Sequence, residues 1–215
     1  SRLGAELILL SKSQDKLETL HDELSSDNSK NILIQPIDFA LSEEKDYVQI
    51  VEALSGEYSK IDGLVNNAGI LGEKKSIEQY NYKTWKQVMK VNLDAGFLLT
   101  KNLIPLLRES KSSSVIFTSS GVGKVGRPYW GSYSVSKFAT EGLMQILSEE
   151  LQNTSSIRVN CINPGAVRTK MRKSAYPAEN PEINPLASEI MKPYIFLMSD
   201  VSENINGHSI DAQGS

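Results

Sequence analysis

The amino-acid sequence predicts an α/β domain built on a doubly wound parallel sheet, arranged in three layers with helices on both faces. Short apolar runs of strand length alternate with helix-length stretches from one end of the chain to the other. The polar groups that stand out follow the carboxyl ends of those runs, which is where open parallel sheets bind ligands. Residues 1–215 contain no linker that would divide them, so we expect a single domain.

Composition narrows the possible functions. The chain has 215 residues, of which 40% are hydrophobic, enough for one sizeable core. The net charge is −3 without a basic block, so neither nucleic acid nor an anionic membrane is an expected partner. No apolar run approaches the roughly 18 residues of a membrane span, and cytoplasm is the expected compartment. Cys161 lies in an apolar run and is expected to be a buried, inert thiol; the two histidines lack metal-ligand spacing.

The first third of the chain predicts strands and helices in strict alternation. Leu17, Leu20 and Leu24 form an apolar stripe at helical spacing. Glu44 and Asp46 lie where a helix dipole favours acidic residues, in the first turn of the next predicted helix. The expected elements are strands at 6–10, 32–37 and 63–65, helices at 14–24 and 43–58, and a loop at 25–30.

The remainder continues the alternation with longer helices. A helix over 81–107 is too apolar for a simple surface helix, so we expect it to pack on the sheet and on a partner subunit. Residues 170–185 hold three prolines and few large apolar side chains, which predicts a loop or lid that orders on binding. The other expected elements are helices at 133–151 and 186–199 and strands at 115–117, 157–162 and 208–211.

The stretch 114–137 carries the chemistry. A buried strand ends near Ser120, a glycine-rich loop follows, and Tyr133 and Lys137 share one face of the next helix. An ammonium one turn away lowers the pKa of a tyrosine, and a serine hydroxyl can hydrogen-bond a substrate oxygen. This combination suits the interconversion of a carbonyl and an alcohol. The alternative is an ordinary loop-to-helix junction with an exposed tyrosine.

The order and spacing of several motifs decide between these two interpretations. They are Asn66-Asn67-Ala68-Gly69, Asn92, Ser120, Tyr133-x-x-x-Lys137, and Pro164-Gly165 followed by Thr169. With them the chain resembles the short-chain dehydrogenase/reductase family over essentially its whole length, which implies a Rossmann-type fold. Stretches such as LVNNAGILG and RVNCINPGAVRTKMR resemble the YciK-type branch of bacterial oxidoreductases more narrowly.

The resemblance implies four catalytic residues. Tyr133 would be the general acid/base, and Lys137 would lower its pKa while hydrogen-bonding the nicotinamide ribose. Ser120 would orient the substrate oxygen. Asn92 would hold a water in a proton relay behind Lys137. No metal ion is implied.

The resemblance also implies a nucleotide site. Asp38 would cap the adenine ring, and the Asn66 to Gly69 turn would line the adenosine side, although this turn can equally serve to support the sheet. The nicotinamide carboxamide and diphosphate would lie against the turn at Pro164. The expected cofactor-binding residues are Ser11, Lys12, Asp38, Phe39, Asn66, Ala68, Gly69, Tyr133, Lys137, Pro164, Gly165, Val167 and Thr169.

The residues after the first strand predict the choice of nucleotide. An acidic residue at this point would bind the ribose 2′-hydroxyl of NAD and repel a 2′-phosphate. The chain instead has Ser11, Lys12 and Ser13, a cation flanked by two hydroxyls, which favours NADP(H) over NAD(H). The alternative is that Lys12 is a solvated loop lysine.

One family feature is absent from these residues. The family begins with a strand and a glycine-rich turn of the type TGxxxGxG, and residues 1–215 contain neither. We expect both to precede residue 1. Were the 215 residues the whole protein, weak nucleotide binding and poor stability would be expected.

The predicted function is an NADP(H)-dependent oxidoreductase that acts on a small carbonyl or alcohol substrate and forms a homodimer or homotetramer. A catalytically silent regulatory or scaffold protein of the same fold is the alternative. Residues 70–75, 122–130 and 171–185 are expected to contact the substrate. The side chains of Tyr129, Trp130, Met171 and Tyr176 suggest an apolar pocket there.

Overall fold

The computed structural model describes residues 3–25 and 32–214 and confirms an α/β fold with parallel strands. Its contacts separate two compact units, Ser1–Glu43 and Glu44–Ser215. Each unit is described by itself below.

The first unit is a parallel strand pair with its crossover helix. Strand β1 (Leu7–Ser11) pairs with β2 (Ile32–Pro36), and Leu9 lies opposite Ile34. Helix α1 (Gln14–Ser25) connects them and packs on both strands. Leu17 of the expected stripe is buried, whereas Leu20 is exposed. The loop expected at 25–30 lies outside the described residues, except for Ser25 at the end of α1.

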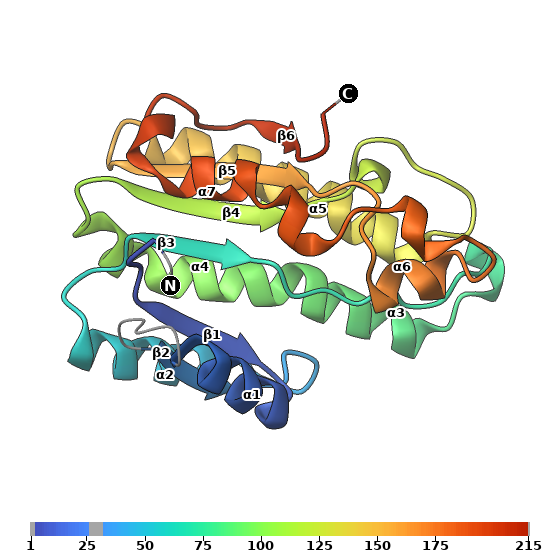
Figure 1. The fold of residues 1–215 in the computed structure, drawn as a ribbon, viewed down its shortest axis with the longest axis horizontal. Helices are drawn as coiled ribbons and strands as arrows, with labels where there is room; N and C mark the ends of the chain where they lie inside the picture. Colours follow the sequence, from blue (N-terminus) through green and yellow to red (C-terminus); the bar gives the residue numbers. More distant parts are fainter. Residues whose placement is uncertain (1–2, 26–31, 215) are drawn as a thin grey trace. The chain divides into compact units, whose positions relative to one another are not determined.

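The second unit has three layers (Figure 1). Its sheet contains β3 (Gly63–Asn66), β4 (Ser113–Thr118), β5 (Ile157–Asn163) and β6 (Ser209–Asp211), all parallel and in that order. Helices α4 (Ala95–Arg108) and α5 (Gly131–Leu151) cover one face, and α7 (Lys192–Met198) covers the other. Helix α2 (Glu44–Glu57) packs on α4. The strands match their predicted positions closely.

The prediction of a single helix over 81–107 is wrong in one respect. Helix α3 (Tyr82–Met89) passes into a π-helical turn, Lys90–Asp94, before α4 begins. Turns of this kind accommodate an extra residue and are frequent at functional sites. The turn places Asn92 in the interior, where its side chain holds the backbone of Ile70.

The C-terminal part also departs from the sequence prediction. The expected loop 170–185 contains a short helix, α6 (Lys170–Ala175), because Thr169 Oγ1 accepts a hydrogen bond from Arg172 N at 3.1 Å and caps it. The expected helix 186–199 is broken into a 3₁₀ turn, Ala187–Ile190, and α7. Pro193 explains the break, because proline fits the first turn of a helix but not its interior.

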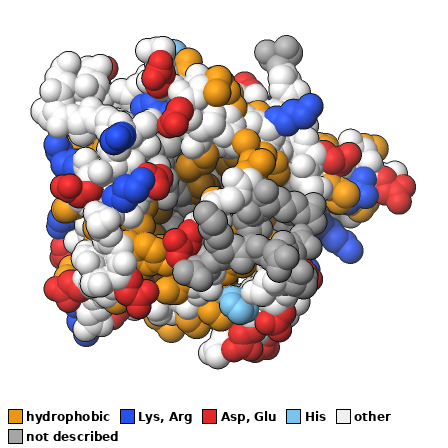
Figure 2. Space-filling view, turned by 60° about the vertical axis from the view of Figure 1, so that its left-hand side comes forward, with side chains coloured by type: hydrophobic (Ala, Val, Ile, Leu, Met, Phe, Trp, Pro, Cys, Tyr) orange, Lys and Arg blue, Asp and Glu red, His pale blue; other side chains and the backbone are white. Residues whose placement is uncertain are grey.

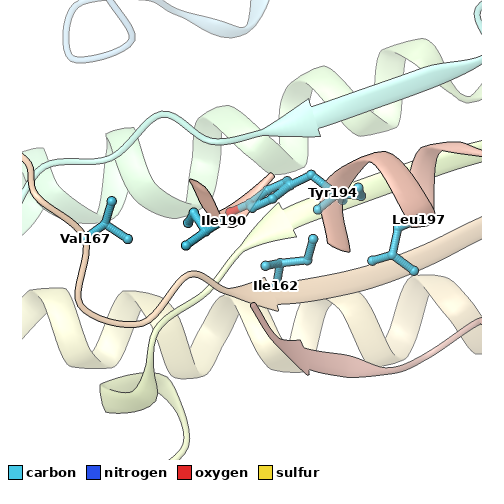
Figure 3. Close-up of a cluster of buried hydrophobic side chains, with 6 residues drawn as sticks. Ile162, Val167, Ile190, Tyr194 and Leu197 are labelled. Carbon is cyan, nitrogen blue, oxygen red and sulfur yellow. The ribbon is translucent and has the colours of Figure 1, made fainter. Parts of the chain in front are cut away.

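Alternating side chains of β4 and β5 fill the two sides of the sheet. Ile116 and Ile162 pack with Tyr194 and Leu197 of α7 (Figure 3). Phe117 points to the other face, where an added Cβ on Gly96 of α4 would lie 3.2 Å from its ring. This alternation is what buries a parallel sheet on both faces.

Arg158 links β5 to the end of α7. Its buried guanidinium donates from Nη1 to the carbonyl oxygens of Leu197 (3.1 Å) and Ser202 (3.0 Å), and from Nη2 to that of Ser199 (3.3 Å). The last carbonyls of a helix lack partners within the helix, and here Arg158 and the Ser202 hydroxyl supply donors to them.

Replacing Arg158 by Met is expected to lower the free energy of unfolding by about 2–4 kcal/mol, because three hydrogen bonds from a buried charged donor are lost. Urea denaturation measures the change. Arg108→Met is the matched control, since Arg108 bonds Thr154 O at an exposed site and its loss is expected to cost less than about 1 kcal/mol. Equal losses in both variants would contradict this account of Arg158.

Candidate active site

Ser120, Tyr133 and Lys137 come together between the end of β4 and the first turns of α5. The 3₁₀ turn Gly121–Gly123 follows Ser120 and packs directly on α5. An added Cβ on Gly123 would lie 2.8 Å from Lys137 Cβ, so only glycine allows this approach. The hydroxyl of Ser120 lies close enough to Tyr133 to favour its phenolate.

Lys137 is a buried lysine at the base of the cluster. Its side chain donates from Nζ to Thr118 O at 2.6 Å, and Nζ lies 5.7 Å from the centre of the Tyr133 ring. Burial lowers the pKa of Lys137 to about 8, and the nearby Cys161 and Glu141 oppose this shift.

The pKa of Tyr133 departs from the sequence-based expectation. Burial raises the pKa of Tyr133 above its ordinary value, and the Ser120 hydroxyl only partly offsets this. The net shift is upward because the phenolate would lie in a buried setting, where the loss of hydration disfavours charge. A lowering effect of Lys137 on this pKa stays a prediction.

Asn92 fastens the segment after β3 to α5. Its Oδ1 accepts from Ile70 N at 2.8 Å, and its Nδ2 donates to Ile70 O and to Ser136 Oγ, each at 3.0 Å. Gly69 lies beside it, and an added Cβ there would lie 3.6 Å from Asn92 Oδ1 and 3.9 Å from Lys137 Nζ. Asn92 therefore lies near Lys137, and both hydrogens of its side-chain amide are donated to Ile70 O and Ser136 Oγ. The role of Asn92 in a water relay stays a prediction.

The expected nucleotide residues of the second unit lie at the ends of β3 and β5. Asn66 Nδ2 donates to Thr100 Oγ1 at 3.0 Å, which ties β3 to α4 and fits the alternative that this turn supports the sheet. Gly69 is close to Lys137, whereas Ala68 is exposed.

The turn after β5 is held by internal contacts. Pro164 O accepts from Gln213 Nε2 at 2.8 Å, and Gly165 N donates to Asn163 Oδ1 at 3.1 Å. The Val167 side chain belongs to the hydrophobic core, and Thr169 caps α6. Binding of a nucleotide by these residues remains a prediction.

Four expected nucleotide residues belong to the first unit. Ser11 ends β1 and Lys12 is exposed directly after it. Asp38 Oδ1 accepts from Ala40 N at 2.9 Å and Phe39 is buried, so both shape the turn after β2. Adenine capping by Asp38 stays a prediction.

Two further residues of the cluster were not singled out from the sequence. Ser136 Oγ donates to Tyr133 O at 2.8 Å and accepts from Asn92, and Thr118 supplies the carbonyl that binds Lys137. Ser136 lies one turn beyond Tyr133, so helical spacing would have indicated it. The contact of Thr118 depends on tertiary packing and leaves no signal in the sequence.

The remaining surface and thiol match the expectations from composition. On the face that Figure 2 presents, basic and acidic side chains are interspersed rather than gathered in one block. Cys161 is free and buried, and burial raises the pKa of its thiol well above the usual range.

Across residues 3–25 and 32–214, no cluster of three His, Cys, Asp or Glu side chains is arranged to hold a metal ion. No helix of this described part is long and apolar enough to cross a membrane.

Known proteins resemble this chain in sequence and in fold. The profile of the short chain dehydrogenase family matches residues 1–180. The oxidoreductase YciK of Escherichia coli K12 is 40% identical over 213 residues, which cover 99% of this chain and 84% of that protein. A short chain dehydrogenase of Escherichia coli CFT073 complexed with NADPH is 40% identical, with a TM-score of 0.92 over 96% of this chain and 85% of that one. A Shigella flexneri 2a counterpart complexed with NADP is 39% identical, with the same TM-score and coverage.

Proposed function

The chain belongs to the short chain dehydrogenase family and is an oxidoreductase, and on that premise we propose that it is an NADP(H)-dependent carbonyl reductase. In this proposal Tyr133 is the general acid/base, Ser120 orients the substrate oxygen, and Lys137 binds the nicotinamide ribose. Asn92 positions the segment after β3 against α5 and holds the relay water. The observation that carries the proposal is the buried Tyr133 ring 5.7 Å from the buried Nζ of Lys137, at the end of the strand that leads to Ser120.

The residues present fit a bound nicotinamide nucleotide. Lys137 Nζ uses one donor for Thr118 O, which leaves two for the hydroxyls of a ribose. Glycine at position 69 leaves space next to this ammonium. The nucleotide supplies the hydride that forms the new C–H bond at the carbonyl carbon.

The raised pKa of Tyr133 suits the direction of reduction. A tyrosine whose pKa lies above its ordinary value is protonated at neutral pH and can act as an acid. In our proposal Tyr133 gives its hydroxyl proton to the substrate oxygen as the carbonyl π bond breaks, while Ser120 donates a second hydrogen bond to that oxygen. The ammonium of Lys137 then stabilises the phenolate that forms.

NADP(H) is the proposed nucleotide, supported by the exposed Lys12 after β1 and by the NADPH and NADP bound to the two solved relatives. We expect NADPH to bind more tightly than NADH in a fluorescence titration. Lys12→Glu is expected to weaken NADPH binding roughly 10- to 100-fold and to leave NADH binding nearly unchanged, because only NADPH carries the 2′-phosphate.

Lys16→Glu is the matched control for this titration. Lys16→Glu makes the same change of charge on the exposed side of α1. It should change the affinities for NADPH and NADH only slightly and by the same factor. A Lys12→Glu variant that keeps its preference for NADPH would contradict the role of Lys12.

A homodimer or homotetramer in the cytoplasm completes the proposal. Helix α5 exposes Val135, Phe138 and Ile146, which are 41–58% accessible and would be covered by a partner subunit. Light scattering of the purified protein tests the assembly. No observation specifically favours the alternative of a catalytically silent scaffold.

A further inference from the structure

Two cations and two aromatic rings form a cluster close to Tyr133. The ammonium of Lys74 lies 3.8 Å from the centre of the Trp130 ring and 5.3 Å from that of Tyr176. The guanidinium of Arg172 lies 3.9 Å from the same Tyr176 ring. The apolar pocket expected from Trp130 and Tyr176 is therefore wrong in character, because both rings have cations on their faces.

This cluster adjoins the proposed reaction centre directly. The Trp130 and Tyr133 rings are 5.7 Å apart between centres, and the Trp130 and Tyr176 rings are 6.0 Å apart. Trp130 is thus a neighbour of both Lys74 and Tyr133.

Lys74 is the cation of this cluster without a counter-charge. Arg172 donates from Nε to Glu179 Oε2 at 2.6 Å and makes a second bond to the same carboxylate. The neighbouring Lys75 lies 3.5 Å from Glu73 Oε2. Among the described residues, no carboxylate lies within ion-pairing distance of Lys74. Lys74 is exposed to solvent, and partial desolvation together with the nearby Arg172 lowers its pKa.

The segment that carries Lys74 is fixed in place at two points. Glu73 N donates to Tyr80 Oη at 3.0 Å, and Tyr80 Oη is also hydrogen-bonded to Ser132 Oγ at 2.8 Å. Asn92 holds Ile70 on the other side. These contacts attach the backbone at Ile70 and Glu73 to α5 and to the π-helical turn, so the backbone that leads into Lys74 is positioned before any ligand binds.

We propose that Lys74 binds an oxyanion of the substrate, so that this enzyme acts on a carbonyl or alcohol compound that carries a carboxylate or phosphate group. The inference rests on the proposed function, because it assumes that the substrate oxygen meets Tyr133. An oxyanion at this site would replace the missing counter-charge of Lys74, while Trp130 would cover the carbon chain between the two polar ends.

A pair of probes separates recognition of charge from the reaction itself. The first is 4-oxopentanoate and the second its methyl ester, which has the same ketone and no negative charge. With NADPH, Lys74→Met is expected to raise KM for 4-oxopentanoate roughly 10- to 100-fold at nearly constant kcat, since a charge-assisted hydrogen bond is lost. KM for the ester should stay unchanged.

Lys75→Met is the matched control. It removes the same charge one residue along, from a lysine that already lies near Glu73, and is expected to leave both KM values unchanged. If Lys74→Met and Lys75→Met behave alike, or if Lys74→Met affects acid and ester equally, Lys74 does not recognise the anion and the inference is overturned. The proposed function would survive that result.

Fluorescence gives a readout that does not depend on turnover. The chain has two tryptophans, so Trp85→Phe leaves Trp130 as the reporter. Inorganic phosphate and acetate, titrated at constant ionic strength, should change its emission to saturation, and Lys74→Met should abolish the change while Lys75→Met keeps it. Saturation without any turnover of either ketone would support the oxyanion site and count against the proposed function. A titration without saturation would overturn the inference.

Discussion

Tyr133→Phe is expected to lower kcat for ketone reduction by roughly 10²- to 10⁴-fold while NADPH binding is kept. The change removes one hydroxyl, the proposed proton donor, and keeps the ring that packs against Trp130. Steady-state kinetics with 4-oxopentanoate or its ester measures turnover, and nucleotide fluorescence measures binding. The loss should appear in kcat because the proton is transferred in the transition state.

Tyr82→Phe is the control for the loss of a hydroxyl. Tyr82 is the first residue of α3, is 70% exposed, and should tolerate the change with kcat within about twofold of the parent. Near-normal turnover in Tyr133→Phe would remove the basis for the proposed mechanism. A parent protein that binds NADPH and reduces no carbonyl compound would instead favour the catalytically silent alternative.

The sequence predicted those parts of the site that depend on local pattern. Tyr133 and Lys137 lie four residues apart, so helix α5 alone places them on one face. Ser120 follows a strand of β-branched and aromatic residues whose end was readable from the glycines after it. The parallel sheet followed from the alternation of strand-length and helix-length stretches, and its strand positions from apolar runs.

What the sequence could not predict depends on packing between distant segments. The π-helical turn that contains Asn92 interrupts a continuous apolar tract without any glycine or proline to mark it. The contacts of Lys74 with Trp130 and Tyr176 join three segments that are far apart in the chain. The aromatic residues Trp130 and Tyr176 therefore indicate an apolar pocket as long as their charged neighbours are unknown.

The direction of the pKa shift of Tyr133 could not be predicted from the sequence for the same reason. From spacing alone, the ammonium of Lys137 is the only visible influence, and it favours the phenolate. Burial acts in the opposite direction and is the largest cause of the shift, and it depends on tertiary packing. The sign of the shift follows from tertiary packing.

Lys137→Met is expected to change how stability depends on pH. Below pH 8, Lys137 is charged in the folded and unfolded states alike, so the cost of burying the charge is present in full. Between the folded pKa of about 8 and the ordinary value of 10.5, the folded protein has released a proton that the unfolded chain still holds. The contribution of Lys137 to stability therefore rises with pH across this window, is complete above it, and is lost as pH falls through about 8.

Methionine has no such titration, so the stability of the parent relative to Lys137→Met should increase by on the order of 3 kcal/mol from pH 7.5 to 10.5. Urea denaturation at several pH values measures the difference. Removing the exposed Lys101 in the same way should change stability by less than about 1 kcal/mol at each pH. A constant difference between the parent and Lys137→Met would mean that the bond to Thr118 O keeps Lys137 charged throughout. Burial would then not control the charge at the base of the site, and the ammonium would remain available to a phenolate at high pH.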